Sequence, residues 1–251
     1  MPLPLSIALI SNNEEKNLRR CLRSIEDLAQ EIILVDSGST DATLSIAKEF
    51  GAKTYHQEWL GYRDQKNCAL TFCTQPWVLA LDCDEELSPK LKNSLIQFFE
   101  QGDCDHFHGA TFHRCTWFLG CWIRHGDWYP DTKLRLFRRA DGVWIEPIHE
   151  TVLLSGPTTH LRGDLLHYSF PSMESYIEKI HPFAEEFFQK QQEKNWSLAA
   201  TISRPLWRFF RAYVLRCGFL DGFPGLWIAV ATTFSVFVRY SRSFEESTKK
   251  E

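Results

Sequence analysis

The sequence predicts an α/β fold in which helices flank a mostly parallel sheet, followed by a helical C-terminal region. In about the first hundred residues, short apolar runs alternate with segments whose apolar residues recur at helical spacing, which is the pattern of βα units. From about residue 172 onward helical patterns replace strand patterns. The length of 251 residues and the hydrophobic content of 44% suffice for one large domain, or for one domain with an appendage.

Strands and helices are expected to alternate in order along the first part of the chain. Apolar runs predict strands at 5–10, 31–35, 52–55 and 77–81. Helices are expected after the acidic pair Glu14-Glu15, after the turn 36–41 with its helix-capping residues, and over 63–73. A further helix should begin at Pro89 with Ser88 as its N-cap. Because ligands bind outside the carboxyl ends of parallel strands, Asp36 and the Asp82–Asp84 segment should face one crevice.

Charge and cysteine content exclude several classes of protein. The net charge of −4 gives no global basic excess, so a nucleic-acid backbone is not an expected partner. The eight cysteines are scattered without a CxxC pair, which favours reduced thiols over a zinc site or a disulfide scaffold. The first residues lack a basic segment and soon become polar, so no secretory signal is expected and the chain should stay in the cytoplasm.

The C-terminal region combines arginines with aromatic residues. Between Ser203 and Ser243 six arginines accompany a single acid, Asp221. The uncharged run Gly222–Val238 falls just short of a membrane-spanning length, and Pro224 interrupts its start. We therefore expect this run to lie in a membrane interface. The alternative is a buried helical hairpin that covers the rest of the fold.

Two carboxylates one residue apart end a buried strand at Asp82-Cys83-Asp84. Such a pair can share a hard divalent cation, and Mg²⁺ or Mn²⁺ typically combines few carboxylates with substrate phosphates. A solvated acidic cluster at the end of a strand is the alternative. The position after an apolar strand, together with Asp36 at a neighbouring strand end, favours the metal.

Several segments together resemble a known family. The first set comprises Ser11–Glu15, Val35–Asp41, Gln65–Asn67 and Leu81–Glu85. These four resemble the family 2 inverting glycosyltransferases of the GT-A fold. The second set comprises His125–Asp131, Arg135–Arg139, His149-Glu150 and Gly218–Gly222. It is similar to the subgroup that adds glucose or a related hexose to the lipopolysaccharide inner core, typified by the heptose β-1,4-glucosyltransferases.

The resemblance implies a donor site for a UDP-sugar. Asp36 would hydrogen-bond the uracil or the ribose, and the backbone near Ser11 would bracket the base. Glu14 and Asp82 would also belong to this site, with Asp82 facing the ribose or the metal. Lys66 would be a second cation beside the diphosphate.

The same resemblance implies a cation, Mg²⁺ or Mn²⁺, bound by Asp84, with Asp82 beside it. His149 would be a third metal ligand or would orient Glu150. The metal would offset the charge that builds up on the leaving diphosphate. Asn12 and Cys83 depart from the residues usual in these motifs, but neither side chain must contact substrate.

Inversion requires a base that removes the proton of the acceptor hydroxyl. The resemblance makes Glu150 the expected base and Asp131 the second candidate. Trp128 offers a flat aromatic surface for a sugar ring. Arg135 and Arg138 could bind phosphates of an anionic acceptor, because guanidinium pairs with phosphate in a bidentate way.

The expected organisation is a glycosyltransferase domain over 1–170 and a helical region over 171–251. Within the domain, 1–103 would form the nucleotide-sugar half and 104–170 the acceptor half. The acceptor would be a lipid-linked saccharide reached at the cytoplasmic face of the inner membrane, with the protein bound peripherally. Two other readings stay open. A nucleotidyltransferase would normally carry a glycine-rich basic loop after the first strand, where Ser11–Glu15 has neither glycine nor net positive charge. A non-catalytic module that only binds nucleotide sugars is the other.

Overall fold

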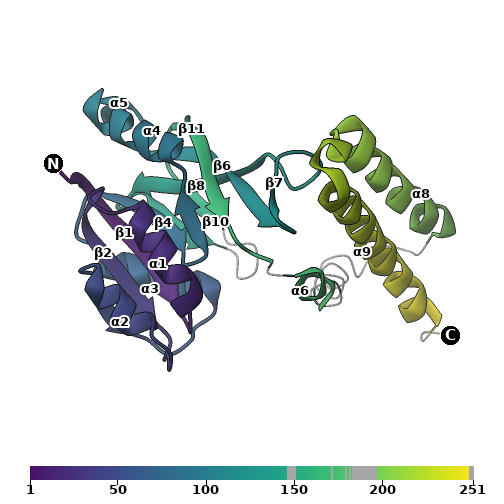
Figure 1. Cartoon of the computed structure of the whole chain (residues 1–251), viewed down its shortest axis with the longest axis horizontal. Helices are drawn as coiled ribbons and strands as arrows, with labels where there is room; N and C mark the ends of the chain where they lie inside the picture. Colours follow the sequence, from purple (N-terminus) through teal and green to yellow (C-terminus); the bar gives the residue numbers. More distant parts are fainter. Residues whose placement is uncertain (146–150, 171, 179, 181, 183–196, 249–251) are drawn as a thin grey trace. The chain divides into compact units, whose positions relative to one another are not determined.

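The computed structural model describes the chain except for residues 146–150, 171, 179, 181, 183–196 and 249–251 (Figure 1). The described residues form two compact units. The first comprises Met1–Arg114 and Asp131–His167, and the second comprises Cys115–Pro130 and Tyr168–Glu251. The segment Cys115–Pro130 thus belongs with the C-terminal helices, although the sequence places it among the strands of 104–170. The assignment of a donor half and an acceptor half stays a prediction.

The first unit is built on a mixed sheet with the strand order β3-β2-β1-β4-β8-β6-β11-β5. Its strands are β1 (Leu3–Ser11), β2 (Ala29–Asp36), β3 (Lys53–His56), β4 (Trp77–Asp82), β5 (Glu85–Leu87), β6 (Gly109–Phe118), β8 (Asp131–Arg138) and β11 (Thr158–His167). The four strands β3, β2, β1 and β4 run parallel. β8 pairs antiparallel with both β4 and β6, so the parallel order is confined to the N-terminal half.

Helices cover both faces of this sheet. They are α1 (Glu15–Ser24), α2 (Thr43–Glu49), α3 (Tyr62–Phe72), α4 (Pro89–Glu100) and the short α5 (Asp103–His106). Alternate side chains of β1 point to opposite faces, so Ile7 lies in one core cluster and Ala8 in the other. The first cluster contains α1, α2 and α4, and the second contains α3 with the hairpin of β9 (Gly142–Ile145) and β10 (Thr151–Leu154).

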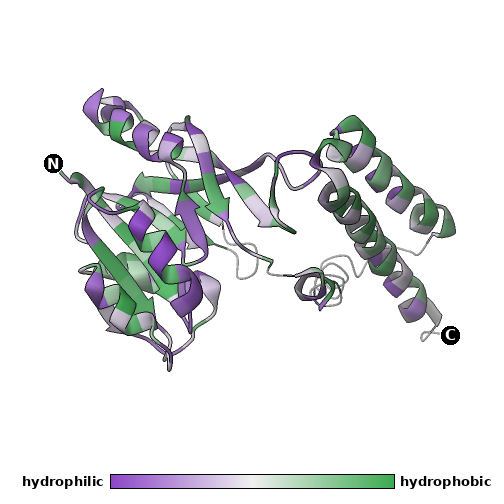
Figure 2. Ribbon diagram, in the orientation of Figure 1, coloured by the Kyte–Doolittle hydropathy of each residue, from purple (hydrophilic) through white to green (hydrophobic). Residues whose placement is uncertain are grey.

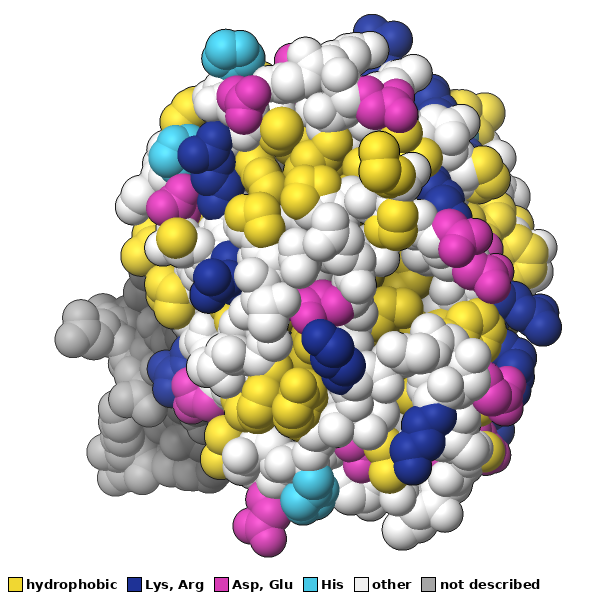
Figure 3. Space-filling model, turned by 90° about the vertical axis from the view of Figure 1, so that its left-hand side faces the viewer, with side chains coloured by type: hydrophobic (Ala, Val, Ile, Leu, Met, Phe, Trp, Pro, Cys, Tyr) yellow, Lys and Arg dark blue, Asp and Glu magenta, His cyan; other side chains and the backbone are white. Residues whose placement is uncertain are grey.

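The expected α/β architecture is confirmed in its elements. Each of the four predicted N-terminal strands forms within about two residues of its expected bounds. The Ser88 side chain accepts a hydrogen bond of 3.2 Å from the backbone N–H of Leu91, as an N-cap does, and Pro89 opens α4. The eight cysteines are all free thiols. On the face shown in Figure 3, basic and acidic side chains are interspersed with apolar ones.

The second unit is mainly helical. The end of β6 pairs with β7 (Cys121–Ile123), and the helices are α6 (Met173–Glu178), α8 (Leu198–Phe209) and α9 (Gly222–Thr248). A π-helical turn over Phe210–Leu215 and a 3₁₀ turn over Gly218–Asp221 join α8 to α9, and these two long helices pack against each other. Figure 2 shows that hydrophobic residues dominate α8 and most of α9.

The C-terminal helix is longer than the uncharged run Gly222–Val238. Gly218–Arg242 is long and apolar enough to cross a membrane by length and composition, and only 28% of its most apolar window is buried within the protein. Helix α9 continues beyond Val238 to Thr248, so the length of the helix is compatible with a membrane span. The expectation of an interfacial position stays a prediction.

Gly163 offers a test of how closely β11 approaches α4. Its φ of +110° disfavours any side chain, and an added Cβ would lie 2.4 Å from the backbone nitrogen of Leu91. We expect Gly163→Ala to lower the free energy of unfolding by about 2–4 kcal/mol in urea denaturation, because both strain and overpacking result. Gly51→Ala is the control: its φ is +71° with nothing within 4 Å, so its cost should stay near about 1 kcal/mol. Equal costs would contradict the close packing.

Candidate active site

The predicted acidic residues end neighbouring parallel strands at one edge of the sheet. Ser11 at the end of β1 is in register with Asp36 at the end of β2, and Ile10 is in register with Asp82 at the end of β4. Strands lie about 4.8 Å apart, so Asp36 and Asp82 are separated by about 10 Å across β1. The expectation that both acids share one sheet edge is confirmed.

Asp36 is 2% exposed and holds the loop that follows β2. Its Oδ1 accepts hydrogen bonds from the hydroxyls of Ser11 (2.8 Å) and Ser39 (2.5 Å), and its Oδ2 accepts from the backbone N–H groups of Gly38 and Ser39. Burial raises the pKa of the Asp36 carboxyl, but the bonds from Ser39, Ser11 and Gly38 outweigh it and leave the pKa below its usual value. The carboxylate therefore fixes the backbone of this loop.

Asp82 lies between two cations. Lys66 Nζ is 2.9 Å from Oδ1, and Arg135 Nη2 is 2.7 Å from Oδ2. Both cationic side chains are buried, with 7% and 6% of their surface exposed. Arg135 also contacts the fully buried Glu85 at 3.3 Å, and Glu85 Oε2 accepts a hydrogen bond from the Asp82 backbone N–H. Each carboxylate oxygen of Asp82 thus has a cationic partner.

The cations determine the charge state of Asp82. Burial raises the pKa of its carboxyl, but Arg135 and Lys66 outweigh burial and hold the pKa well below the usual range. The Trp144 ring adds a third contact, because Lys66 Nζ lies 4.8 Å and the Arg135 guanidinium carbon 5.5 Å from the ring centre. The arrangement keeps Asp82 ionised and both cations in fixed positions.

Three consecutive residues of α3 connect the parts of this site. The Gln65 amide donates to the Ser37 hydroxyl (3.0 Å), next to Asp36. Lys66 pairs with Asp82. The Asn67 side chain exchanges two hydrogen bonds with the backbone of Trp144, at 3.0 and 2.9 Å. The Gln65–Asn67 motif therefore ties α3 to the ends of two parallel strands and to β9.

Asp84 stands apart from the cations that hold Asp82. Its Oδ2 is 3.4 Å from His167 Nε2, and its side chain is 27% exposed. Glu14 belongs to the same acidic neighbourhood: burial raises the pKa of Glu14, and the charges of Asp84, Asp41 and Asp82 raise it further. Within the described part of the chain, no group of three or more His, Cys, Asp and Glu side chains is arranged to hold a metal ion.

The structure places Asp131 within an ion-pair network. Its Oδ2 accepts from Arg114 Nη2 at 2.8 Å, and its Oδ1 lies 3.0 Å from Lys133 Nζ. Arg114 also approaches Glu85 at 3.5 Å, so Asp131 joins the network that surrounds Asp82. Because both oxygens of Asp131 already contact cations, its case as the catalytic base is weakened.

Arg138 is not brought to this site. It is in register with Trp77, at the opposite end of β4 from Asp82, which corresponds to about 16 Å along the strand. Its guanidinium donates to the backbone carbonyls of Cys104 and Asp105 and lies over the Trp77 ring. These contacts hold Arg138 away from Asp82, and its expected contact with an acceptor phosphate stays a prediction.

The remaining predicted residues are not placed in this network. His149 and Glu150 lie outside the described residues. Trp128 belongs to the second unit, where it stacks on Phe170 with ring centres 5.3 Å apart. The roles of these three residues stay predictions.

Three residues of the site escaped sequence reasoning: Glu85, Trp144 and Arg114. For Glu85 a signal existed, because strand alternation puts it on the same buried face as Leu87. Trp144 and Arg114 carry no comparable signal, since their positions depend on how β9 and β6 meet the parallel half. Arg135 was expected to bind the acceptor, whereas it pairs with Asp82.

Comparisons with known proteins identify the family. The sequence profile described as Glycosyl transferase family 2 matches residues 6–154, which include Asp36, Lys66, Asp82 and Arg135. This chain belongs to glycosyltransferase family 2. The lipopolysaccharide core biosynthesis glycosyltransferase LpsC of Rhizobium meliloti is 30% identical to it over 95% of this chain and 94% of LpsC. An uncharacterised glycosyltransferase of Rickettsia typhi is 30% identical over 98% of this chain and 88% of its own length.

Solved structures also resemble this family 2 glycosyltransferase. Staphylococcus aureus TarS 1–349 in complex with UDP is 16% identical with a TM-score of 0.49, covering 98% of this chain and 92% of that chain. Glucosyl-3-phosphoglycerate synthase from Mycobacterium tuberculosis, in complex with Mn²⁺, UDP-glucose and phosphoglyceric acid, is 22% identical with a TM-score of 0.36. That match covers 46% of this chain and 44% of that chain.

The Lys66–Asp82 pair predicts a pH-dependent contribution to stability. Because the pKa of Asp82 is lower in the folded protein, its stabilisation is full above the unfolded pKa of about 3.9 and declines as the pH falls below that value. The free energy of unfolding of the wild type should therefore be lower at pH 3 than at pH 7, whereas Lys66→Gln should lower it by about 1–3 kcal/mol at both, because the folded protein keeps Asp82 ionised at both pH values. Urea denaturation at both pH values measures the difference.

Lys16→Gln is the matched control, since Lys16 is an exposed lysine of α1. Its effect should stay within about 0.5 kcal/mol at either pH. A cost for Lys66→Gln no larger than that of Lys16→Gln would contradict the ion pair assigned to Asp82.

Proposed function

We propose that this family 2 glycosyltransferase transfers a hexose from a UDP-sugar to a lipid-linked saccharide acceptor, with inversion at the sugar carbon. The observation that carries the proposal is the cluster of Lys66, Asp82 and Arg135 beside Asp84 at the carboxyl ends of the parallel strands. Ligands of open α/β sheets bind at this edge. The match of LpsC along nearly its whole length supports an acceptor related to the lipopolysaccharide inner core. Glucose is the hexose that we favour.

The proposal assigns the nucleotide to the strand ends around Asp36. Asp36 orders the loop Ser37–Ser39 through three hydrogen bonds and, by the proposed role, presents this loop to the uracil or the ribose. Lys66 and Arg135 supply buried positive charge for the pyrophosphate. In a site of low polarity such fixed charges stabilise the leaving UDP more strongly than they would in water.

A divalent cation, Mg²⁺ or Mn²⁺, fits Asp84 better than Asp82. Both oxygens of Asp82 already contact cations, whereas Asp84 Oδ2 lies 3.4 Å from His167 Nε2. Carboxylate oxygen is a ligand that both ions prefer, and substrate phosphates and water typically complete the shell. The cation would supply further charge to the leaving diphosphate. We keep Asp82 as the residue that positions Lys66 and Arg135.

For the catalytic base we retain Glu150 over Asp131. The carboxylate of Asp131 is engaged by Arg114 and Lys133. Glu150 follows His149 in the chain, so His149 could orient it or bind the metal. A correctly positioned carboxylate typically contributes a factor of about 10²–10⁴ to the rate.

Asp84→Asn tests the donor site and the competing functions together. With a panel of UDP-sugars, Mn²⁺ and an inner-core lipid acceptor, we expect the wild type to release UDP faster when the acceptor is present. Asp84→Asn should slow this release about 10²–10³-fold, because a metal ligand of this kind supplies several kcal/mol of transition-state stabilisation. It should also weaken Mn²⁺ binding in the presence of UDP, as measured by calorimetry.

Asp105→Asn serves as control, because Asp105 is an exposed acid of α5. Unchanged UDP release by Asp84→Asn would refute the donor-site assignment. Donor binding by the wild type without any UDP release would favour the non-catalytic module, and release of pyrophosphate from a sugar phosphate and UTP would favour a nucleotidyltransferase.

We further propose that the second unit binds the cytoplasmic face of the membrane peripherally. Large apolar side chains are exposed on both long helices. On α8 they include Leu206 and Trp207, and on α9 Phe223, Val230 and Phe234. Arginines on the same helices suit anionic headgroups, and aromatic side chains suit the acyl boundary. A lipid-linked acceptor would then be met within the plane of the membrane.

Single substitutions on these helices test membrane binding. Trp207→Ser and Phe234→Ser should each lower the fraction that floats with anionic vesicles by about tenfold in partition constant, since burying such a side chain contributes about 1.5–3 kcal/mol. Leu153→Ser is the matched control, because Leu153 is equally exposed at 56% but lies on β10 of the first unit. Equal flotation of all the variants and the wild type would contradict a membrane-binding surface on α8 and α9.

A further inference from the structure

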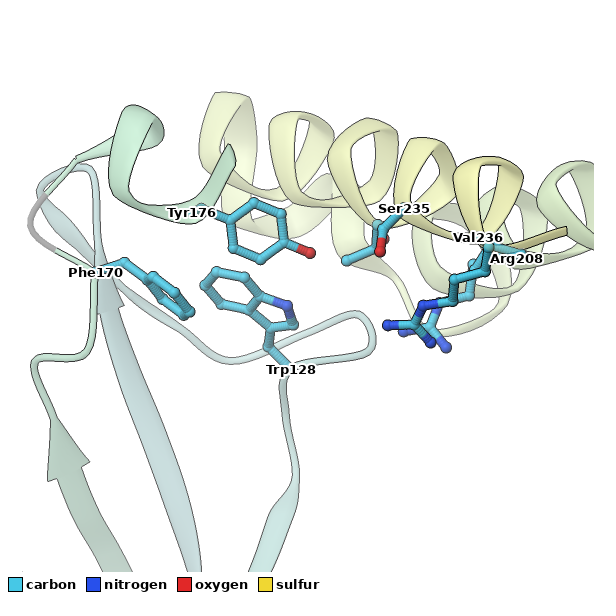
Figure 4. Close-up of a pocket in the computed structure, with 8 residues that line it drawn as sticks. Trp128, Phe170, Tyr176, Arg208, Ser235 and Val236 are labelled. Carbon is cyan, nitrogen blue, oxygen red and sulfur yellow. The ribbon is translucent and has the colours of Figure 1, made fainter. Parts of the chain in front are cut away.

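The second unit contains a cavity of about 230 Å³ bordered by α6, α8 and α9 (Figure 4). It has an aromatic side, formed by Trp128, Phe170 and Tyr176, and a polar side that includes Arg208, Arg239 and Ser235. Pockets that hold drug-sized ligands typically measure about 300–1,000 Å³. The cavity is therefore too small for a nucleotide sugar and suits a single small group.

The aromatic side is a preformed wall. The three rings contact one another with centre-to-centre distances of 5.3–5.5 Å, and Trp227 extends the cluster behind Tyr176. Tyr176 is 8% exposed. In Figure 4 its hydroxyl points toward Ser235 and Arg208. The wall thus presents a hydroxyl to the polar side of the cavity.

On the polar side, several arginines gather around one buried acid. Asp127, with 1% of its side chain exposed, contacts Arg208 through Nε and also pairs with Arg211 and Arg216. One carboxylate therefore serves three guanidiniums, and Arg239 acts on Arg208 as a further like charge. Burial, together with the repulsion from Arg211 and Arg239, lowers the pKa of Arg208 even though Asp127 raises it.

Asp127 contacts Arg208 at Nε, and the Arg208 side chain lines the cavity. A guanidinium presents a planar fork that matches two oxygens of a phosphate. The hydroxyls of Ser235 and Tyr176 supply additional donors of the kind that phosphate oxygens accept. An anion of this class would fit the guanidinium and hydroxyl groups that line the cavity.

We propose that this cavity is a binding site for the phosphate group of an anionic lipid, held by Arg208 and Arg239 against the aromatic wall. The same two helices expose the apolar side chains Leu206, Trp207 and Phe234, along which acyl chains can lie. This contiguity on α8 and α9 is what favours a lipid over a free phosphate. The site would add a headgroup pocket to the proposed membrane association. It depends on that proposed function in one respect, that the lipid comes from the membrane.

The test uses monomeric ligands, so that it does not depend on vesicles or on catalysis. Dihexanoyl phosphatidylglycerol, dihexanoyl phosphatidylcholine and inorganic phosphate are each titrated into the full chain by calorimetry. We expect the phosphatidylglycerol to bind more tightly than the other two. Arg208→Gln and Arg239→Gln should each weaken its binding about tenfold, the typical effect of losing a charge-assisted hydrogen bond.

Arg204→Gln is the matched control, because Arg204 is an exposed arginine of α8 that donates to the Tyr240 hydroxyl, one turn before Arg208. It should leave binding unchanged. Arg208 also holds Asp127, so a folding defect is checked with Ser235→Phe, which fills the cavity without touching that ion pair and should abolish binding. Asp84→Asn should bind the lipid like the wild type, which separates failure of this site from failure of the donor site.

Three results would overturn the proposal. Equal affinities for inorganic phosphate and for phosphatidylglycerol would identify a site for free phosphate, and preference for phosphatidylcholine would identify a choline cage. If Arg239→Gln and Ser235→Phe both bind phosphatidylglycerol as the wild type does, the cavity is not the site. If the protein binds the monomeric lipid but does not float with vesicles, that result would refute the proposed membrane-binding surface on α8 and α9 but would support the headgroup pocket.

Discussion

The pairing of Asp82 with Lys66 and Arg135 is the interaction on which the candidate active site depends. It places two buried cations within 3 Å of one carboxylate at the end of β4. Isolated buried charges are costly, but here each has a partner, and Glu85 and Trp144 supply further contacts. The result is a fixed arrangement of two buried cations and two carboxylates at the sheet edge. In the proposed reaction this region receives the pyrophosphate without further reorganisation.

The two halves of the sheet contribute different parts of this arrangement. The parallel half brings the ends of β1, β2 and β4 together, which positions Asp36, Ser11 and Asp82. The strand β8, which runs antiparallel to β4, contributes Arg135. Helix α3 then connects both, because its residues Gln65, Lys66 and Asn67 contact the loop after β2, Asp82 and β9 respectively. The candidate active site thus depends on the sheet topology and on one helix.

The second unit differs from the first in how its charged and apolar side chains are arranged. Its buried Asp127 gathers three arginines, and aromatic rings pack beside them, while α8 and α9 leave large apolar side chains exposed. A unit with apolar side chains on its surface and arginines in its interior is suited to both the acyl chains and the charged headgroup of an anionic amphiphile. In the proposed function this unit handles the lipid part of the substrate, and the first unit handles the nucleotide sugar.

Local patterns in the chain were sufficient to predict the elements and the edge of the sheet where the site lies. Apolar runs predicted β1–β4, Ser88 and Pro89 predicted the start of α4, and the acids at strand ends predicted the edge that Asp36 and Asp82 share. Which charges meet, by contrast, depends on the packing of distant segments. Lys66 and Arg135 reach Asp82 from positions 16 residues before it and 53 residues after it, and Arg138 lies at the far end of β4 although it is only three residues from Arg135. Strand direction and register set these distances, and no local periodicity records them.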